Sequence, residues 1–229
     1  KMFQQILNYK LSPEKKYKYS DIGYYFALRI IESQSKMPLD KFLDQSYYKP
    51  LGLSTMGYRP LEKFSKDRIA PTEYDRNFRN QLVHGDVHDP GAAMLGGVGG
   101  HAGLFSNVND IAKIMQMFVQ DGEYGGERYL NKSTIDLFNK CYYCSEENRR
   151  GVGFDKPQIE ENGPTCGCVS MNSFGHSGWT GTYTWADPDE KIVYVFLSNR
   201  SYPNSVENKL LKNNIRTDIQ KLIYESIIN

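Results

Sequence analysis

The sequence predicts an α+β fold in which an antiparallel β-sheet is flanked by helices. Two runs rich in Thr, Tyr, Trp and Val, residues 181–186 and 192–199, are separated by an Asp-Pro-Asp turn, a pattern typical of a β-hairpin. Elsewhere apolar residues recur at helical spacing, most clearly in residues 107–119. With 229 residues, the chain is long enough to bury a sizeable core.

The N-terminal elements are expected to be helices joined by irregular segments. Residues 1–18 are polar and rich in lysine, which indicates a short helix or a loop. Ser20 or Asp21 is a candidate N-cap for the next helix, and a second amphipathic helix covers roughly residues 39–48. Residues 54–95 lack periodicity, so we expect a long irregular segment there.

A glycine-rich stretch, residues 96–106, leads into the helix that starts near residue 107. Asn107 is its expected N-cap, and Gly122 is expected to end it. The later elements are expected in this order: a short helix at about 133–139, a strand that starts at 152–154, the strand pair, and a final helix at about 204–228.

The composition excludes two classes of partner. The 28 basic and 27 acidic residues leave a net charge of +1, so no nucleic acid partner is expected. No run of about 18 apolar residues is present, so no membrane span is expected. Aromatic residues make up 13% of the chain, which is compatible with a cleft that faces a peptide or a carbohydrate.

The four cysteines leave three alternatives open. Cys141 with Cys144 and Cys166 with Cys168 have a spacing that resembles a zinc ribbon, although Cys-x-Cys replaces the second Cys-x2-Cys. Disulfides are expected instead if the compartment is oxidising, and free buried thiols are the third alternative. The pattern favours free thiols or disulfides over zinc.

Two further patterns are too weak to indicate a metal or a cofactor. His84-x3-His88 has a possible ligand spacing, but loop histidines often bind backbone groups. Gly97-x-Gly99-x-x-Ala102 formally matches a dinucleotide-binding loop, but no strand is expected before it. We therefore expect no metal and no cofactor.

Two short motifs point to acyl-transfer chemistry when they are taken together. Tyr19-Ser20-Asp21 precedes a helix, and His176-Ser177-Gly178 opens a strand. A tyrosine, an Asn or Asp two residues later and a polar triplet at the start of a strand form the serine acyl-transfer site of penicillin-recognising enzymes.

On these motifs the chain resembles the C-terminal part of class C β-lactamase-related serine hydrolases, a group that includes penicillin-binding proteins, esterases and D-aminopeptidases. The stretches that carry the resemblance are residues 19–25, 48–56, 85–90 with 97–106, and 174–181. The chain looks most like the domain that is joined to family 3 glycoside hydrolases in some bacteria. The resemblance implies a partial β-lactamase/transpeptidase-like domain over residues 1–229, helical in about 1–140, with the sheet strands and C-terminal helix in about 150–229.

The resemblance also implies roles for individual residues. Tyr19 would be the general base or proton relay, and Asp21 would take the place of an Asn that orients the substrate. His176 would flank the acyl pocket. Unlike Asn, Asp21 cannot donate a hydrogen bond, and its charge opposes a phenolate at Tyr19. The implied substrate-binding positions are Ser177, Gly178, Trp179 and Thr180, with a backbone N–H near Trp179 or Thr180 in the oxyanion hole.

The Ser-x-x-Lys nucleophile motif of the family has no convincing counterpart. Ser33 and Lys36 lie at the far end of the helix that Tyr19 precedes, roughly 20 Å away at about 1.5 Å per residue. Ser12 and Lys15 are too close to Tyr19 for a helix that turns back. We interpret both as coincidences, so the chain is either part of a truncated hydrolase, inactive alone, or a pseudoenzyme. Because the sequence opens abruptly inside the family pattern, we expect a truncated hydrolase.

The resemblance has a further consequence for the sheet. In the family, N-terminal strands lie beside the strand that corresponds to Ile192 to Asn199. Without them this strand becomes an open apolar edge. We expect the chain to self-associate through this edge, to swap, or to cover the edge with its C-terminal helix.

We expect a serine hydrolase of the acyl-enzyme type that acts on an ester, an amide or a D-amino-acid peptide. The alternatives are a non-catalytic binding or accessory module that keeps the cleft and a zinc-stabilised domain. His176-Ser177-Gly178 in place of Lys-Thr-Gly lacks a fixed positive charge, so esters or D-amino peptides rank above penicillins. The resemblance implies a periplasmic or otherwise extracytoplasmic location.

Overall fold

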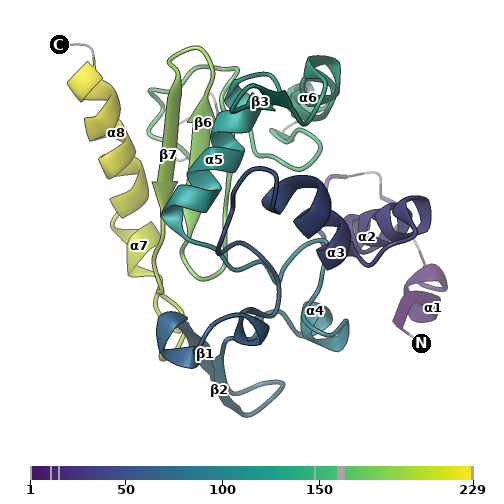
Figure 1. Ribbon diagram of the computed structural model, residues 1–229. Coiled ribbons are helices and arrows are strands. Elements are labelled where there is room, and N and C mark those ends of the chain that lie inside the picture. Colours follow the sequence, from purple (N-terminus) through teal and green to yellow (C-terminus); the bar gives the residue numbers. More distant parts are fainter. Residues whose placement is uncertain (1, 11, 15, 147, 159–162, 228–229) are drawn as a thin grey trace.

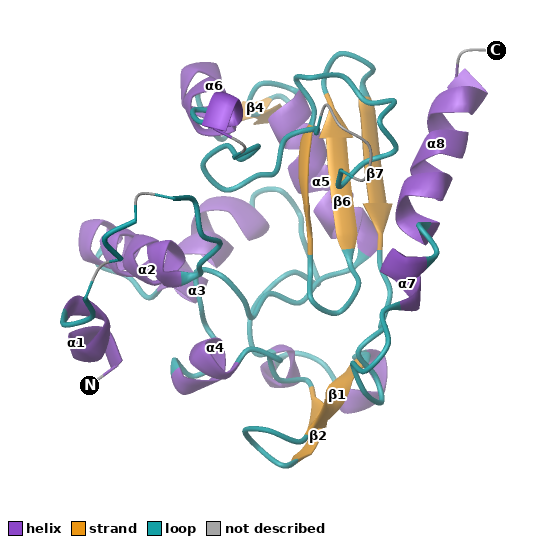
Figure 2. Cartoon of the chain, turned by 180° about the vertical axis from the view of Figure 1, so that it is seen from behind, coloured by secondary structure: helices purple, strands orange, loops and turns teal. Residues whose placement is uncertain are grey.

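The computed structural model describes the 229-residue chain except residues 1, 11, 15, 147, 159–162 and 228–229. The described residues form a three-stranded antiparallel sheet with helices on both faces (Figure 1). A second region, made of helices and a short hairpin, lies beside one end of this sheet (Figure 2). The expected α+β fold is therefore confirmed.

The main sheet has the strand order β5-β6-β7. Its strands are β5 (Phe174–Ser177), β6 (Tyr183–Asp187) and β7 (Ile192–Phe196). The predicted hairpin is β6 with β7, in which Trp185 lies opposite Tyr194. The turn between them is held by Asp187, whose carboxylate accepts hydrogen bonds from the backbone N–H groups of Asp189 and Glu190.

A helix packs on each face of this sheet (Figures 1 and 2). Helix α5 (Val108–Val119) covers the face that carries Phe174 and Ala186. Helix α8 (Ile215–Ile227) covers the face that carries Trp185, whose side chain is 1% exposed. The predicted C-terminal helix is therefore two helices, because α7 (Lys209–Lys212) precedes α8.

Helix α5 also joins the sheet to the N-terminal half of the chain. Asn107 caps it as expected, since its side chain accepts a hydrogen bond from the N–H of Asp110. The buried carboxylate of Asp110 in turn accepts hydrogen bonds from the N–H and the hydroxyl of Thr55, both at 2.7 Å. Met117 packs in a cluster with Tyr48, Leu51, Leu53 and Met56. The segment around Thr55 is thus fixed by the first turn of α5.

The remaining helices agree with the expected regions in most places. Helix α3 continues directly into a π-helical turn, and the two together cover the expected residues 39–48. These helices are α1 (Met2–Leu7), α2 (Ile22–Ser35), α3 (Leu39–Leu43), the turn Asp44–Tyr48, α4 (Pro90–Met94) and α6 (Lys132–Asn139). Among the described residues, no helix is long and apolar enough to cross a membrane.

Two expectations about secondary structure were wrong. Residues 54–95 contain a hairpin of β1 (Pro71–Asp75) and β2 (Gln81–His84). The sequence did not predict it, because these strands are polar and lack a clear alternation of apolar and polar residues. Residues 152–154 are a bend and not a strand, with Gly153 at φ +118. A further hairpin, β3 (Glu123–Tyr124) with β4 (Glu127–Arg128), lies in the part expected to be helical.

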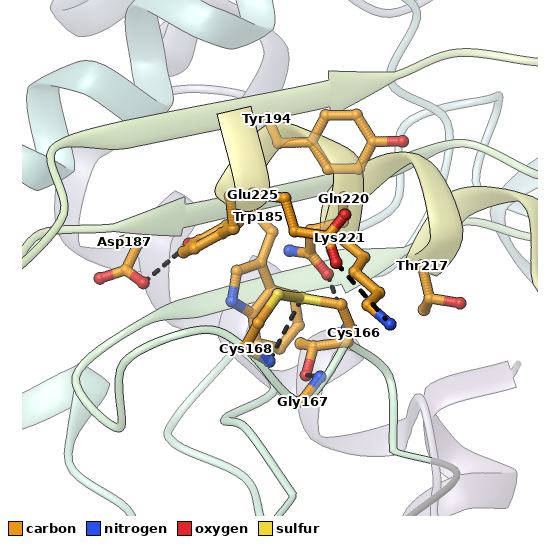
Figure 3. The surroundings of a disulfide bond; sticks show 12 residues. Cys166, Gly167, Cys168, Trp185, Asp187, Tyr194, Thr217, Gln220, Lys221 and Glu225 are labelled. Carbon is orange, nitrogen blue, oxygen red and sulfur yellow. Dashed lines mark hydrogen bonds and ion pairs between the residues drawn. A yellow bond between two sulfur atoms is a disulfide. The ribbon is translucent and has the colours of Figure 1, made fainter. Parts of the chain in front are cut away.

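The cysteines form two local disulfides, Cys141–Cys144 and Cys166–Cys168. The zinc and free-thiol alternatives are therefore wrong. Figure 3 shows the second disulfide beside helix α8, where the N–H of Cys166 donates to the buried amide oxygen of Gln220 at 3.0 Å.

Candidate active site

Tyr19 and Asp21 lie immediately before helix α2. Ser20 supplies the local hydrogen bond at this helix start, since its hydroxyl accepts from the N–H of Ile22 at 3.2 Å. The side chain of Asp21 makes no capping bond, so its carboxylate is directed elsewhere. Tyr19 is 56% exposed.

His176 lies on β5, and the loop that follows this strand is tightly closed. The N–H of Gly178 donates to the carbonyl of Thr182, and the N–H of Gly181 donates to the carbonyl of Gly178. Gly181 has φ +93, which favours glycine. The N–H groups of Trp179 and Thr180, called the open N–H groups below, donate to no acceptor in the described part of the chain.

Arg150 connects these two motifs. Its guanidinium carbon lies 4.8 Å from the centroid of the Tyr19 ring, and its Nη1 lies 3.1 Å from Nε2 of His176. Tyr19 and His176 therefore contact the same guanidinium group and lie on the same side of the molecule. No motif in the sequence contains Arg150, so sequence reasoning missed it.

Arg150 is held in place by a buried carboxylate. Asp155 is 4% exposed and pairs with Arg150 at 2.6 Å and with Arg149 at 3.3 Å. The backbone of Asp155 exchanges two hydrogen bonds with Gly175 on β5, at 2.8 and 3.1 Å. A side chain at position 175 would lie 2.2 Å from the carbonyl oxygen of Thr184, so this close approach requires glycine.

The surroundings of Tyr19 favour the protonated phenol. Burial raises the pKa of Tyr19, and the negative charge of Asp21 raises it further. The Arg150 guanidinium acts in the opposite direction but does not cancel these effects. Tyr19 is therefore a phenol at neutral pH, able to donate a proton.

Asp21 belongs to a second polar group with Asp89 and His101, whose potential ligand atoms lie within 4.8 Å of one another. Hydrogen bonds hold two members of this group, Asp89 and His101. Nε2 of His101 lies 2.7 Å from Oδ1 of Asp89, and the same oxygen caps α4 by accepting from the N–H of Ala92. The His101 ring stacks on Tyr25, with centroids 4.5 Å apart.

The spacing of His84 and His88 does not create a metal site. Nε2 of His84 lies 2.6 Å from the backbone oxygen of Ile69, which is the ordinary role expected for a loop histidine. Nδ1 of His88 lies 2.6 Å from Oε1 of Glu73. The two imidazoles therefore have separate partners.

Of the two formal Ser-x-x-Lys matches, Ser33 and Lys36 lie at the end of helix α2 that is far from Tyr19. Ser33 lies near the C-terminal end of the 14-residue helix α2, whose start follows Tyr19, and Lys36 is the C-cap. Lys15 lies outside the described residues, and the hydroxyl of Ser12 accepts a hydrogen bond from the N–H of Glu14.

Two cavities lie away from this site. One of about 500 Å³ is bordered by Phe42, Tyr47 and Tyr129, and one of about 340 Å³ is bordered by Leu28 and Arg59. Neither is bordered by Tyr19 or His176.

The sheet with helices on both faces and the two motifs beside it define a β-lactamase/transpeptidase-like fold. Solved structures agree: a β-lactamase from Mycobacterium bovis superposes with TM-score 0.65 at 16% identity, covering 94% of this chain and 66% of that one. A variant of simvastatin synthase from Aspergillus terreus gives TM-score 0.65 at 16% identity, with 94% and 56% covered.

The chain belongs to the beta-lactamase family, whose model matches residues 1–217. It is 38% identical over 203 residues to a protein of Escherichia coli K12 named "Putative D-alanyl-D-alanine carboxypeptidase", covering 83% of this chain and 46% of that protein. A protein of the same name from Salmonella agona is also 38% identical, with the same coverage. The chain thus spans about half the length of these relatives. The fusion to a glycoside hydrolase stays a prediction.

Proposed function

We propose that this chain forms the Tyr and His half of a serine hydrolase site that cleaves peptides ending in D-amino acids, or related esters and amides, through an acyl-enzyme. The observation that carries the proposal is the meeting of Tyr19 and His176 at Arg150, beside two open backbone N–H groups. The 38% identity to a protein named as a carboxypeptidase supports the substrate class.

Each group has a part in this chemistry. A serine oxygen attacks the substrate carbonyl carbon, and the negative charge that forms on the carbonyl oxygen is stabilised by the N–H groups of Trp179 and Thr180. The C–N bond then breaks, and the leaving amine takes a proton from the phenol of Tyr19. The serine proton passes to the Tyr19 oxygen in the same step in which the phenol proton moves to the amine nitrogen, so the phenol is restored and the relay is balanced. Hydrolysis repeats these steps with water as the nucleophile.

The test is covalent labelling of the full-length protein. A fluorescent fluorophosphonate is expected to label it, and a peptide ending in D-alanyl-D-alanine is expected to compete. Tyr19→Phe should slow labelling by about 10² to 10⁴-fold. Tyr9→Phe, at a site that is 78% exposed, is the control and should label normally.

A non-catalytic module is the second candidate, because Asp21 replaces the hydrogen-bond donor that an Asn would offer. In that case the protein would bind the peptide but would not be labelled. Labelling that is equal in the wild type and Tyr19→Phe would contradict the role of Tyr19.

The two disulfides support an extracytoplasmic location, since disulfides persist in oxidising compartments. Alkylation of the protein from its native source, without reduction, should modify none of the four cysteines. Four alkylated cysteines would contradict this location.

We also propose that copies of the chain associate through the edge of β7. Among the described residues, β7 pairs only with β6, while α8 packs on its face through Tyr194. The outer edge therefore keeps unpaired backbone groups next to apolar side chains. Light scattering after size exclusion should give a mass above 26.3 kDa that increases with concentration. A monomer at all concentrations would contradict the proposal.

A further inference from the structure

We infer that Arg150 is a positioning residue of this site: its guanidinium fixes the imidazole of His176 in one tautomer and places a positive charge against the ring of Tyr19. This inference rests on the proposed function, because it assigns a task to a residue that contacts both motifs. Its side chain is 22% exposed, so the group is held by protein contacts while its edge still reaches solvent.

The contacts of one nitrogen atom establish the orientation of the imidazole. Nη1 of Arg150 lies 2.6 Å from Oδ1 of Asp155 and 3.1 Å from Nε2 of His176. The contact with Asp155 is an ion pair, and the contact with His176 is a hydrogen bond in which the arginine nitrogen can only donate. Nε2 of His176 is therefore the acceptor.

The other ring nitrogen completes the arrangement. Nδ1 of His176 lies 2.7 Å from the carbonyl oxygen of Ser177, which only accepts. Nδ1 therefore carries the hydrogen, and the ring is fixed at both nitrogens. His176 and Ser177 directly precede the loop with the open N–H groups.

The charge balance explains why an arginine is useful next to Tyr19. Two guanidinium groups, Arg149 and Arg150, share the single carboxylate of Asp155, so the pair keeps an excess positive charge. Four charged or titratable groups influence Tyr19: Asp21, Arg150, Tyr24 and Asp155. Arg150 is the only cation among these four, and it opposes the effect of Asp21.

Arginine and lysine should differ in a way that separates the two tasks. A lysine at position 150 keeps the positive charge, but its single ammonium group lacks the planar fork that reaches Tyr19, His176 and Asp155 together. We therefore expect Arg150→Lys to keep the effect of the positive charge on the pKa of Tyr19 but to lose the fixed tautomer of His176. Arg150→Gln should lose both.

The test uses NMR on the 229-residue chain, so it does not depend on a nucleophile. Imidazole ¹⁵N spectra, with His176→Gln for assignment, should show His176 in the wild type mainly with its hydrogen on Nδ1. In Arg150→Gln a mixture of tautomers is expected. Ring ¹³C titration, with Tyr19→Phe for assignment, should show a higher pKa of Tyr19 in Arg150→Gln and a value close to wild type in Arg150→Lys.

Arg149→Gln is the matched control, because Arg149 pairs with the same Asp155 but makes no contact with Tyr19 or His176 in the described structure. It should leave both signals unchanged. Unchanged signals in Arg150→Gln would overturn the inference, and if that variant does not fold, an unchanged His176 tautomer in Arg150→Lys would do so. Failure of the proposed function would appear separately, as absence of serine labelling.

Discussion

The imidazole of His88 stacks on the indole of Trp179, with ring centroids 4.9 Å apart and planes 14° apart. This contact joins the segment before α4 to the loop after β5. Glu73 on β1 holds His88 from the other side, through Nδ1 at 2.6 Å, and the Arg200 guanidinium lies 4.8 Å from the Trp179 ring centroid. The loop that offers the open N–H groups is thus supported from the β1–β2 hairpin.

Removal of the stack should make Trp179 more accessible. Because Trp185 is 1% exposed, acrylamide quenching of tryptophan fluorescence reports mainly on Trp179, which is 52% exposed. His88→Ala is expected to increase the quenching constant, since the indole loses a stacked neighbour. His84→Ala is the control, because His84 binds only the backbone oxygen of Ile69 among the described residues. Equal quenching in both variants would show that the stack does not hold the loop.

The disulfides should contribute modestly to stability, because they close very short loops. Each links cysteines only two or three residues apart, for which the chain-entropy model gives roughly 1.5–2 kcal/mol. Replacement of Cys166 and Cys168 by serine should lower the melting temperature by about 3–8 °C in a chain of this size. Calorimetry is the measurement. A variant without cooperative unfolding would indicate that this disulfide is essential to the fold.

The local patterns of the sequence were sufficient for much of the fold. Strands β6 and β7 are rich in β-branched and aromatic residues, and α5 has both a cap and an apolar stripe, so local chemistry and tertiary structure agree there. The β1–β2 hairpin could not be predicted in this way. Its strands are short. Its buried residues include Thr72, Glu73 and Asp75, which are polar, so the strand lacks the apolar alternation that sequence patterns detect.

The motifs located the two sides of the site, but they did not locate what connects them. Arg150 precedes a bend and not a strand, and it reaches His176 through Asp155, which pairs with both Arg150 and Gly175. Such a contact between segments far apart in sequence has no local signal. The state of the cysteines also remained open, because their spacing favoured free thiols or disulfides over zinc but could not separate the first two.

Asp187 should be important for stability, because it is fully buried and accepts several hydrogen bonds. Ser170 donates its N–H at 2.8 Å and its hydroxyl at 2.5 Å, and Tyr224 donates its hydroxyl at 2.7 Å. Burial raises the pKa of Asp187, but these bonds outweigh it and hold the pKa below its usual value. Asp187→Asn should therefore lower the free energy of unfolding by about 2–4 kcal/mol.

Urea unfolding measures this loss. Tyr224→Phe removes only one of the donors and should cost about 1–2 kcal/mol. Asp189→Asn, in the same turn but exposed, should change the free energy of unfolding by less than about 0.5 kcal/mol. If the Asp187→Asn and Asp189→Asn variants had the same free energy of unfolding, the hydrogen bonds of Asp187 would not stabilise the protein as predicted.

Lys156 should make the protein more stable as the pH rises above 8. Its amine is buried, donates to the carbonyl of Asn172 at 2.9 Å and to the side-chain oxygen of Asn139 at 3.1 Å, and lies 5.7 Å from the Phe174 ring centroid. Burial lowers the pKa of Lys156 to about 8, although Asp187 and Asp189 partly oppose this.

The sign follows from proton binding. Between pH 8 and the ordinary lysine pKa of 10.5, the unfolded chain binds the proton at Lys156 more strongly than the folded chain does. The free energy of unfolding therefore rises with pH in this range, by no more than about 1.4 kcal/mol per pH unit for one proton. Urea unfolding between pH 7.5 and 9.5 should show this slope, and Lys156→Met should remove it. Lys63→Met, at an exposed position, should keep it. An identical slope in the wild type and Lys156→Met would mean that the amine of Lys156 stays charged in the folded protein.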